Sequence, residues 1–439
     1  MLSTAAESLP TDDASSKFSL YQGFVVGLCA LVAMLDGFDT QAIAFVAPVI
    51  AKSWGAPVAG FGPVFAVGLF AGILGSVAFG VVADRRGRRV TIIATTAMIA
   101  AGSLLTLLSK GMVDLTAYRF FTGFGLGGAI PSIVALSAEY SPPRIRATVV
   151  TAMFCGIPLG AVLGAAASVP LIKSGGWPAV FLAGGIIPLL LLPVLMWRLP
   201  ESIGWLKANG KAELAEKIRS RTHLPSLSAP VDGLAVKPAP AKITALLASG
   251  RAMATLCLWS TFFLSLLLVF FLVSWIPSIA VAETASPSMG AMAAAVLNFG
   301  GIAGALVIGR LIDRFGAFAV VGSAYVLGAC GMMAIGLGPD ARASVFMFSL
   351  VGGFFGMGAQ LCVVAIAADF YPLTLRATGV GAAMGAGRFG AITGSLVGGA
   401  LLAGVGGAAR FPPVLSGLAI AACVAVLGAG FFKRRESKD

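Results

Sequence analysis

Two aspartates lie in the middle of an apolar segment, in the run Asp36-Gly37-Phe38-Asp39. The segment extends from about 22 to 49, and at about 1.5 Å per residue Asp36 lies about 21 Å beyond Gln22, near the middle of a bilayer. Because they are three residues apart, both carboxylates share one helix face. An ionisable group at this depth costs at least about 2.5 kcal/mol and by default marks a proton or ion site. The alternative is a packing role at a helix break made by Gly37, with an arginine neutralising the acids.

Two arginines lie within other apolar segments. Arg388 lies about 18 Å into its segment, and its guanidinium fork suits a carboxylate. We therefore expect Arg388 to bind the carboxylate of a substrate while Asp36 and Asp39 face it. A permanent bridge from Arg388 to either aspartate is the alternative. Arg119 is a further candidate for substrate binding, and it either pairs with an acid of the first segment or turns outward to Asp114.

Further candidates for a binding site are two amides and an aromatic ring within apolar segments. Asn298 and Gln360 are candidates because buried amides need hydrogen-bond partners, and Trp275 lies in a Phe-rich segment that offers a surface for a ring. Each amide could instead join neighbouring helices. The six cysteines are isolated and the single histidine, His223, lies in a polar stretch, so the spacing predicts no metal site, disulfide or cofactor.

The composition is that of a polytopic membrane protein. The chain has 439 residues, of which 58% are hydrophobic and 11% are charged, against about 25% charged in soluble domains. The net charge of +12 does not indicate nucleic acid, because most Lys and Arg residues fall in short loops on one side of the predicted membrane. This distribution places both termini in the cytoplasm, as expected for a multi-pass protein of a bacterial inner membrane.

Twelve apolar segments are predicted, six on each side of a long polar stretch. They span approximately 22–49, 58–83, 90–109, 113–138, 147–172, 178–197, 251–276, 289–311, 317–337, 343–367, 375–404 and 411–432. The chain thus divides into a cytoplasmic tail (1–21), a six-helix bundle (22–197), a cytoplasmic loop (198–250), a second six-helix bundle (251–432) and a short cytoplasmic tail (433–439). In the loop we expect an interfacial helix from Ile203 to Arg221 and then a flexible linker, with a regulatory partner site as the alternative.

The two bundles repeat each other. The run GVVADRRG at 80–87 recurs as GRLIDRFG at 309–316, and the pattern AEY, Pro, RAT at 138–148 recurs as ADF, Pro, RAT at 368–378. Both matches lie on the same membrane side, so the halves are parallel repeats, which place a substrate cavity near the midplane. Runs of glycine every three or four residues, at 68–75, 156–164 and 390–398, predict close helix approach.

These motifs resemble the major facilitator superfamily. A narrower resemblance to its aromatic acid:proton symporters rests on the aspartate run at 36–39, on Glu139-Tyr140 with Pro142, on the glycines and Gln360 of 352–360, and on the run 371–392. The chain has Ser132 where members of this group often carry Asn, and it lacks an intramembrane histidine that some of them use. These differences leave the identity of the acid open.

The resemblance implies an all-α integral membrane protein with the major facilitator fold, importing an aromatic carboxylate such as 4-hydroxybenzoate, protocatechuate or benzoate by proton symport. It implies proton coupling by Asp36 and Asp39. It also implies that charged residues at the cytoplasmic ends form salt bridges, including Glu139–Arg146 and Asp369–Arg376, that stabilise the outward-open state. These gating residues are Asp84, Arg85, Arg88, Arg89, Glu139, Arg146, Asp313, Arg314, Asp369 and Arg376.

Other functions stay open at this point. The substrate could be another organic anion, such as nicotinate, muconate or a dicarboxylate, and the direction could be export. A transporter-like sensor would need a larger domain outside the membrane, and an enzyme would need a catalytic cluster, which the sequence lacks. Because two symmetric halves form a complete pathway, a monomer binding protons, a small acid and lipid suffices.

Overall fold

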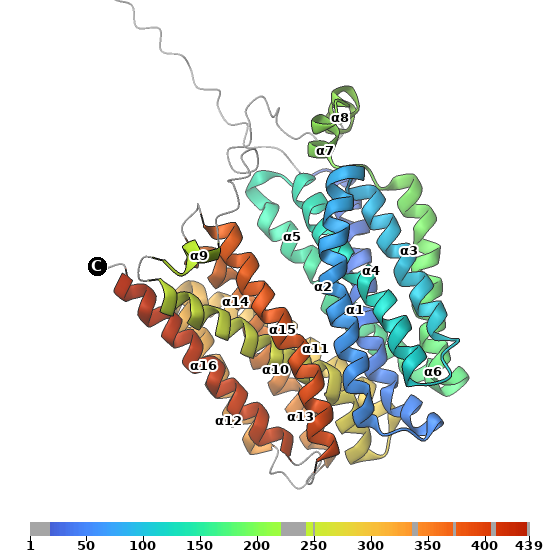
Figure 1. Cartoon of the computed structure of the whole chain (residues 1–439), viewed down its shortest axis with the longest axis vertical. Helices are drawn as coiled ribbons and strands as arrows, with labels where there is room; N and C mark the ends of the chain where they lie inside the picture. The colour runs from blue at the N-terminus through green and yellow to red at the C-terminus, as the bar shows by residue number, and fades with distance from the viewer. Residues whose placement is uncertain are drawn as a thin grey trace, which may run out of the picture.

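A computed structural model of the chain describes residues 18–220, 243–248, 251–335, 341–371, 375–404 and 410–436, which form helices and turns (Figure 1). The first half comprises α1 (Leu20–Trp54), η1 (Val58–Gly60), α2 (Phe61–Arg86), α3 (Arg88–Thr106), α4 (Met112–Glu139), η2 (Pro143–Ile145), α5 (Arg146–Phe154) and α6 (Gly156–Arg198). Between the halves lie α7 (Ile203–Ala208), α8 (Ala212–Ser220) and α9 (Ile243–Leu246). The second half comprises α10 (Ala252–Thr284), α11 (Pro287–Phe315), α12 (Ala317–Ile335), α13 (Ala341–Val351), η3 (Gly352–Met357), α14 (Gly358–Phe370), α15 (Arg376–Ala403) and α16 (Phe411–Glu436).

Two of the predicted segments are joined without a loop. The apolar stretch Thr148–Arg198 is 51 residues long, about twice the length that a bilayer needs. Gly176 interrupts α6 with φ 68° and ψ −166°, and Pro178 follows it. The helix therefore crosses the membrane twice, and the described residues form the twelve crossings of the predicted fold.

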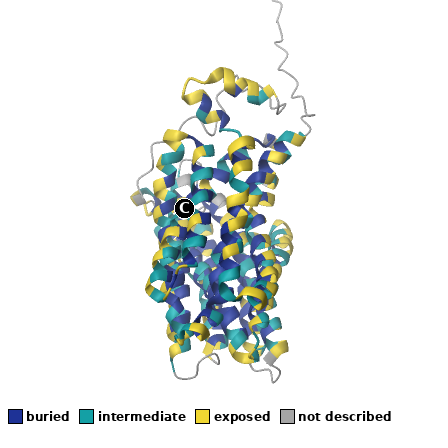
Figure 2. Cartoon of the chain, turned by 90° about the vertical axis from the view of Figure 1, so that its right-hand side faces the viewer, coloured by how far each residue is buried: buried dark blue, intermediate teal, exposed yellow. Residues whose placement is uncertain are grey.

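The outer surface of the bundle is apolar, as a surface in contact with acyl chains must be. Figure 2 shows exposed residues on the outside and buried residues between the helices. Large apolar side chains are among the most exposed, including Val113 and Trp197, each 82% exposed. In a water-soluble protein so much exposed apolar surface would promote association. Here it supports a multi-pass membrane protein.

Glycines allow the tightest helix pairs to form, as their spacing predicts. A Cβ atom added at Gly127 of α4 would lie 1.8 Å from the Gly72 carbonyl oxygen of α2. One added at Gly390 of α15 would lie 2.0 Å from the Phe263 oxygen of α10. Without these glycines the backbones could not approach so closely.

The repeat is visible in the backbone as well. Gly87 ends α2 with φ 97°, and Gly316, at the equivalent position of the second half, ends α11 with φ 89°. Both angles lie where L side chains are strained, so glycine is required at both turns. The repeated motif thus makes the same tight turn in each half.

The two halves meet at one end of the molecule. We call the end that carries α7 and α8 the linker end, and the opposite end the far end. At the far end, Phe65 of α2 stacks edge-on against Trp275 of α10, with ring centroids 5.3 Å apart. A Cβ atom added at Gly399 would lie 2.7 Å from the Ala59 oxygen, so the far ends of η1 and α15 touch. Toward the linker end α2 and α15 diverge (Figure 1).

The predicted single helix from Ile203 to Arg221 is wrong. The chain forms two short helices, α7 and α8, because Asn209 ends the first and Gly210 turns the chain with φ 73°. Arg221, His223 and most of the expected flexible stretch lie outside the described residues, but residues 243–248 of that stretch contain the short helix α9.

Candidate functional site

A cavity of about 410 Å³ lies between the two halves, within the range that holds small ligands. Its wall is mostly apolar, with a few polar side chains. From the first half it is lined by Asp36, Thr40, Ile43, Ala44, Val64, Phe65, Gly68, Leu69, Gly72, Arg119, Gly123, Leu126, Gly127, Ile130 and Ile157. From the second half it is lined by Phe262, Leu266, Phe270, Val273, Ser274, Gln360, Val364, Met384, Arg388 and Ala391.

Asp39 and Arg119 form a buried ion pair within the first half. Arg119 Nη1 lies 2.8 Å from Asp39 Oδ2, with side chains 4% and 1% exposed. Arg119 Nη2 also donates to the Asp39 carbonyl oxygen at 3.1 Å, and Ser103 Oγ donates to Asp39 Oδ1 at 2.6 Å. Arg119 therefore does not turn outward: Asp114 accepts the Lys110 backbone N–H at the far end instead. A charge pair this deep is stable only while both members are charged or suitably hydrogen-bonded.

Asp36 has a different environment, although it lies only one helical turn away. Its side chain lines the cavity and is half-buried, and it forms no ion pair with the described residues. Thr40, one turn further along α1, lines the cavity beside it. The two acids thus differ: Asp39 faces the interior of the first half, and Asp36 faces the space between the halves.

Arg388 brings a positive charge to the opposite wall. Its Nη1 donates to Ser76 Oγ of α2 at 2.8 Å, a contact across the two halves. It forms no ion pair with the described residues, so no permanent bridge to Asp36 or Asp39 exists here. Gln360, on the same side of the cavity, is 7% exposed, and its Oε1 has no hydrogen-bond partner among the described residues. A guanidinium whose hydrogen-bond partner among the described residues is a neutral hydroxyl can receive an anion.

Two predicted binding residues do not line the cavity. Asn298 is fully buried and exchanges hydrogen bonds with Gln41 of α1. Trp275 is fully buried, and its Nε1 donates to the Ser395 carbonyl oxygen at 2.9 Å. Asn298 thus joins α11 to α1, and Trp275 joins α10 to α15. For Asn298 this is the alternative that the sequence left open.

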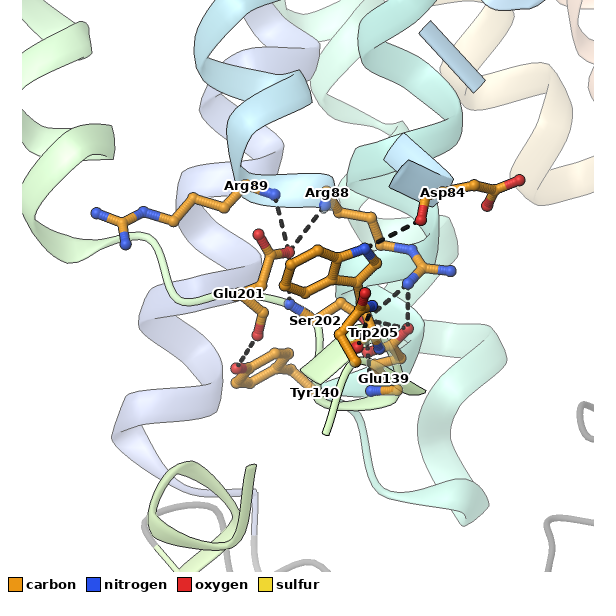
Figure 3. A network of polar contacts seen from close by, with 10 residues as sticks. Asp84, Arg88, Arg89, Glu139, Tyr140, Glu201, Ser202 and Trp205 are labelled. Carbon is orange, nitrogen blue, oxygen red and sulfur yellow. Dashed lines mark hydrogen bonds and ion pairs between the residues drawn. The ribbon is translucent and has the colours of Figure 1, made fainter. Parts of the chain in front are cut away.

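At the linker end, a polar network ties the linker to the first half (Figure 3). Glu201 Oε1 accepts the backbone N–H groups of Arg88 at 2.8 Å and Arg89 at 3.1 Å, so the linker supplies the cap of α3. Arg88 Nη1 lies 3.3 Å from Glu139 Oε1. Glu139 also accepts the Ser202 hydroxyl, at 2.6 Å to Oε2.

Comparisons with known proteins identify the family of the chain. The sequence matches the profile of the Major Facilitator Superfamily over residues 29–362 and 258–439. It is 37% identical to the 4-hydroxybenzoate transporter PcaK of Pseudomonas aeruginosa, over 93% of this chain and 91% of that protein. The chain belongs to the Major Facilitator Superfamily. Within this superfamily it groups with aromatic acid transporters.

Further relatives agree with this assignment. The chain is 35% identical to the gallate transporter of Pseudomonas putida, over 94% of this chain and 93% of that protein. The inward-open structure of the xylose transporter XylE from E. coli has the same fold, with a TM-score of 0.68 at 19% identity over 93% and 95% of the two chains. The protein is therefore a transporter of a small molecule rather than an enzyme.

The predicted gating residues of this transporter are only partly brought together. Glu139 contacts Arg88 instead of the expected Arg146, whose Nε is buried without a hydrogen-bond partner. The physical reason is that Ser202 of the linker contacts both side chains. Its hydroxyl donates to Glu139 Oε2 and accepts a hydrogen bond from Arg88 Nη1.

The remaining gating residues of the transporter take separate positions. The Asp84 carbonyl oxygen accepts Trp205 Nε1 at 3.0 Å, while Arg85 and Asp313 are exposed. The Arg314 guanidinium lies 5.4 Å from the ring centroid of Phe315. The side chains of Asp369 and Arg376 lie outside the described residues, so their predicted pairing stays a prediction.

Several residues of the site were not predicted from the sequence. Ser76 and Ser103 contact Arg388 and Asp39, and Glu201 caps α3, yet each comes from a helix or loop remote in sequence from its partner. A single serine in an apolar segment carries no signal of its own. Glu201 was detectable in principle, because it follows a proline directly after a membrane segment and is the first acid of the linker.

Proposed function

We propose that the protein imports an aromatic monocarboxylate together with a proton by alternating access. The observation that carries the proposal is Arg388: a guanidinium without a carboxylate partner among the described residues, in a largely apolar cavity between the halves. The names of the relatives, which include transporters of 4-hydroxybenzoate and gallate, support this class of substrate.

The proposed binding mode places the carboxylate of the acid on Arg388. A charge-assisted, bidentate contact is stronger than the hydrogen bond to the Ser76 hydroxyl that it would replace or join. The aromatic side chains of the wall, Phe65, Phe262 and Phe270, offer edges and faces to the ring. Gln360, with an unsatisfied amide oxygen, would hydrogen-bond a ring substituent.

The proposed proton site is the pair of Asp39 and Arg119, with Asp36 as a second acid facing the cavity. A proton on Asp39 would remove the negative member of the pair and weaken its hold on Arg119. One proton for each monoanion makes the transported complex electroneutral, so an inside-negative potential does not oppose uptake. Coupling follows if the empty, charged carrier resists the rocking motion that reorients the halves.

We infer the orientation of the chain in the membrane from the distribution of its basic residues. The linker end, which carries Arg85, Arg88 and Arg89, would face the cytoplasm of a bacterial inner membrane, with both termini on that side. The halves are joined at the far end, so the structure would be an inward-open state. The neighbouring fold of XylE was itself captured inward-open.

The proposal is tested by uptake of radiolabelled 4-hydroxybenzoate into proteoliposomes under an imposed inward proton gradient. We expect accumulation above equilibrium in the wild type and its loss in Arg388→Ala. Arg144→Ala, which removes an exposed arginine at the linker end, is the matched control and should retain uptake. Competition by benzoate, gallate, nicotinate and muconate identifies the preferred acid. Absence of uptake for every acid, with or without the gradient, would refute the proposal.

A further inference from the structure

Two amides form the clearest hydrogen-bonded link between the halves. Gln41 Nε2 donates to Asn298 Oδ1 at 3.0 Å, and Asn298 Nδ2 donates to Gln41 Oε1 at 2.9 Å. Asn298 Nδ2 also donates to the Ala294 carbonyl oxygen at 2.9 Å. Gln41 is 5% exposed and Asn298 is fully buried. The oxygen of each amide therefore accepts a hydrogen bond from the other, across the boundary between α1 and α11.

The pair lies in a dry contact, outside the cavity. Phe45, one turn after Gln41, packs in one apolar cluster with Ala165 of α6 and with Ala291 and Ala294 of α11. Neither amide lines the cavity. Both lie beyond the middle of their helices toward the far end, where the halves are closed. The packing of the pair thus gives it no role in holding the substrate in this state.

The energetics of such a pair depend on whether the far end is closed. In the closed contact, each amide has its partner and no water. If the halves separate there, water replaces the partner at little cost. Removing one amide leaves the other buried and unsatisfied only while the contact is closed, whereas replacing both by apolar groups of similar shape removes that penalty. Opposite effects are therefore expected for single and double substitutions.

We propose that Gln41 and Asn298 are gate residues of the transporter: each amide is the other's buried hydrogen-bond partner while the far end is closed, and the pair must break for the far end to open. Asp39, which pairs with Arg119, precedes Gln41 by two residues on α1. A shift of α1 at the proposed proton site would therefore also move Gln41. The inference rests on the alternating access of the proposed function, but on neither its substrate nor its proton.

The test measures opening of the far end by alkylation of a buried cysteine. Ser395 is fully buried on α15, and a Cβ atom added at Gly62 of α2 would lie 3.4 Å from its carbonyl oxygen. Ser395→Cys, in the full chain with the six native cysteines replaced by serine, reports on separation of α2 from α15. The labelling rate with a membrane-impermeant maleimide is measured in proteoliposomes without substrate or gradient.

We expect Gln41→Met and Asn298→Leu to raise the labelling rate about fivefold each, because each removes the hydrogen-bond donor of the remaining buried amide oxygen. The double variant should return to the wild-type rate or below it. Asn209→Leu, which makes the same chemical change at an exposed turn, should have no effect. The midpoint of thermal unfolding of each variant distinguishes gate opening from loss of the fold. If one single variant fails to fold, the comparison of the other single variant with the double variant still tests the proposal.

An unchanged or lower rate in folded single variants would overturn the proposal, as would a double variant as open as the singles. Because the readout uses neither an aromatic acid nor a proton gradient, its outcome is separate from that of the uptake experiment. Uptake without the predicted labelling pattern would leave the transporter but refute the gate, and the reverse result would leave the gate but refute the substrate.

Discussion

At the scale of single residues, the two aspartates of α1 show how one helical turn separates two chemical settings. Asp39 is held by Arg119 and Ser103, and its side chain is 1% exposed. Asp36 meets the cavity instead. The two carboxylates look alike in the sequence but are therefore not interchangeable. The ion pair with Arg119 makes Asp39 the better candidate for coupling transport to protons.

Replacing Asp39 by asparagine should uncouple transport. Asp39→Asn keeps the size of the side chain but cannot carry the charge that alternates with protonation. We expect gradient-driven accumulation to fall at least tenfold, while exchange of labelled for unlabelled acid across the membrane persists, because exchange needs no return of the empty carrier. Counterflow and uptake are measured on the same proteoliposomes. Asp114→Asn, at a half-buried acid at the far end of α4, should behave as wild type, and loss of both activities in Asp39→Asn would contradict the coupling role.

At the scale of helices, glycines decide how closely α2 and α4 approach. Gly127→Ala would place a Cβ atom 1.8 Å from the Gly72 oxygen, and a backbone atom cannot move aside without shifting the helix. Overpacking of this kind costs about 1–3 kcal/mol, so we expect a lower midpoint of thermal unfolding. Gly80→Ala on α2 meets no atom within 4 Å and should leave the midpoint unchanged or raise it. Equal midpoints for the two variants would refute the packing argument.

The linker acts at the same scale, by capping a helix that lacks its own cap. Gly87, which precedes α3, provides no side-chain acceptor, and Glu201 supplies one. We expect Glu201→Ala to speed amide hydrogen exchange at Arg88 and Arg89 about tenfold, because both N–H groups lose their acceptor. Glu213→Ala, at an exposed acid of α8, is the control. Unchanged exchange at these two amides would show that Glu201 is not the cap.

Hydropathy was sufficient to predict the membrane-spanning helices, and glycine spacing to predict close helix approach, whereas the polar side-chain contacts were not predictable. Length and apolar composition predict the twelve crossings, and glycine runs predict which helices pack closely. The rotation of each helix about its axis is set by the whole bundle, so the sequence left open whether Arg119 meets Asp39 or Asp114. The same rotation takes Asn298 to Gln41 and away from the cavity. In this structure the partners of Glu139 come from the linker and from the start of α3, not from the adjacent turn, so its expected pairing with Arg146 in the outward-open state stays a prediction.

At the scale of the whole molecule, the two repeated halves have equivalent helices and turns, but the contacts at their linker ends differ. Gly87 and Gly316 make equivalent turns, yet a Cβ atom at Gly87 would lie 2.1 Å from a Glu201 oxygen, whereas one at Gly316 meets nothing within 4 Å. Among the described residues, the linker thus packs against the turn of the first half through Glu201, and it makes no such contact at Gly316 of the second half. In the proposed alternating-access cycle, the two halves would reorient as distinct bodies around the cavity, with the far end as the contact that changes.

Locking the far end should therefore stop transport without unfolding the protein. A Cβ atom added at Gly62 lies 3.7 Å from the Leu396 Cα atom across the two halves, so Gly62→Cys with Leu396→Cys brings two thiols within reach of a short, reducible cross-linker. We expect the cross-linked double variant, made without the native cysteines, to lose more than nine-tenths of its uptake and to recover on reduction. Each single variant treated in the same way should keep its activity. Since a rigid pore would continue to conduct when one end is tied, full activity in the cross-linked protein would exclude alternating access through this contact.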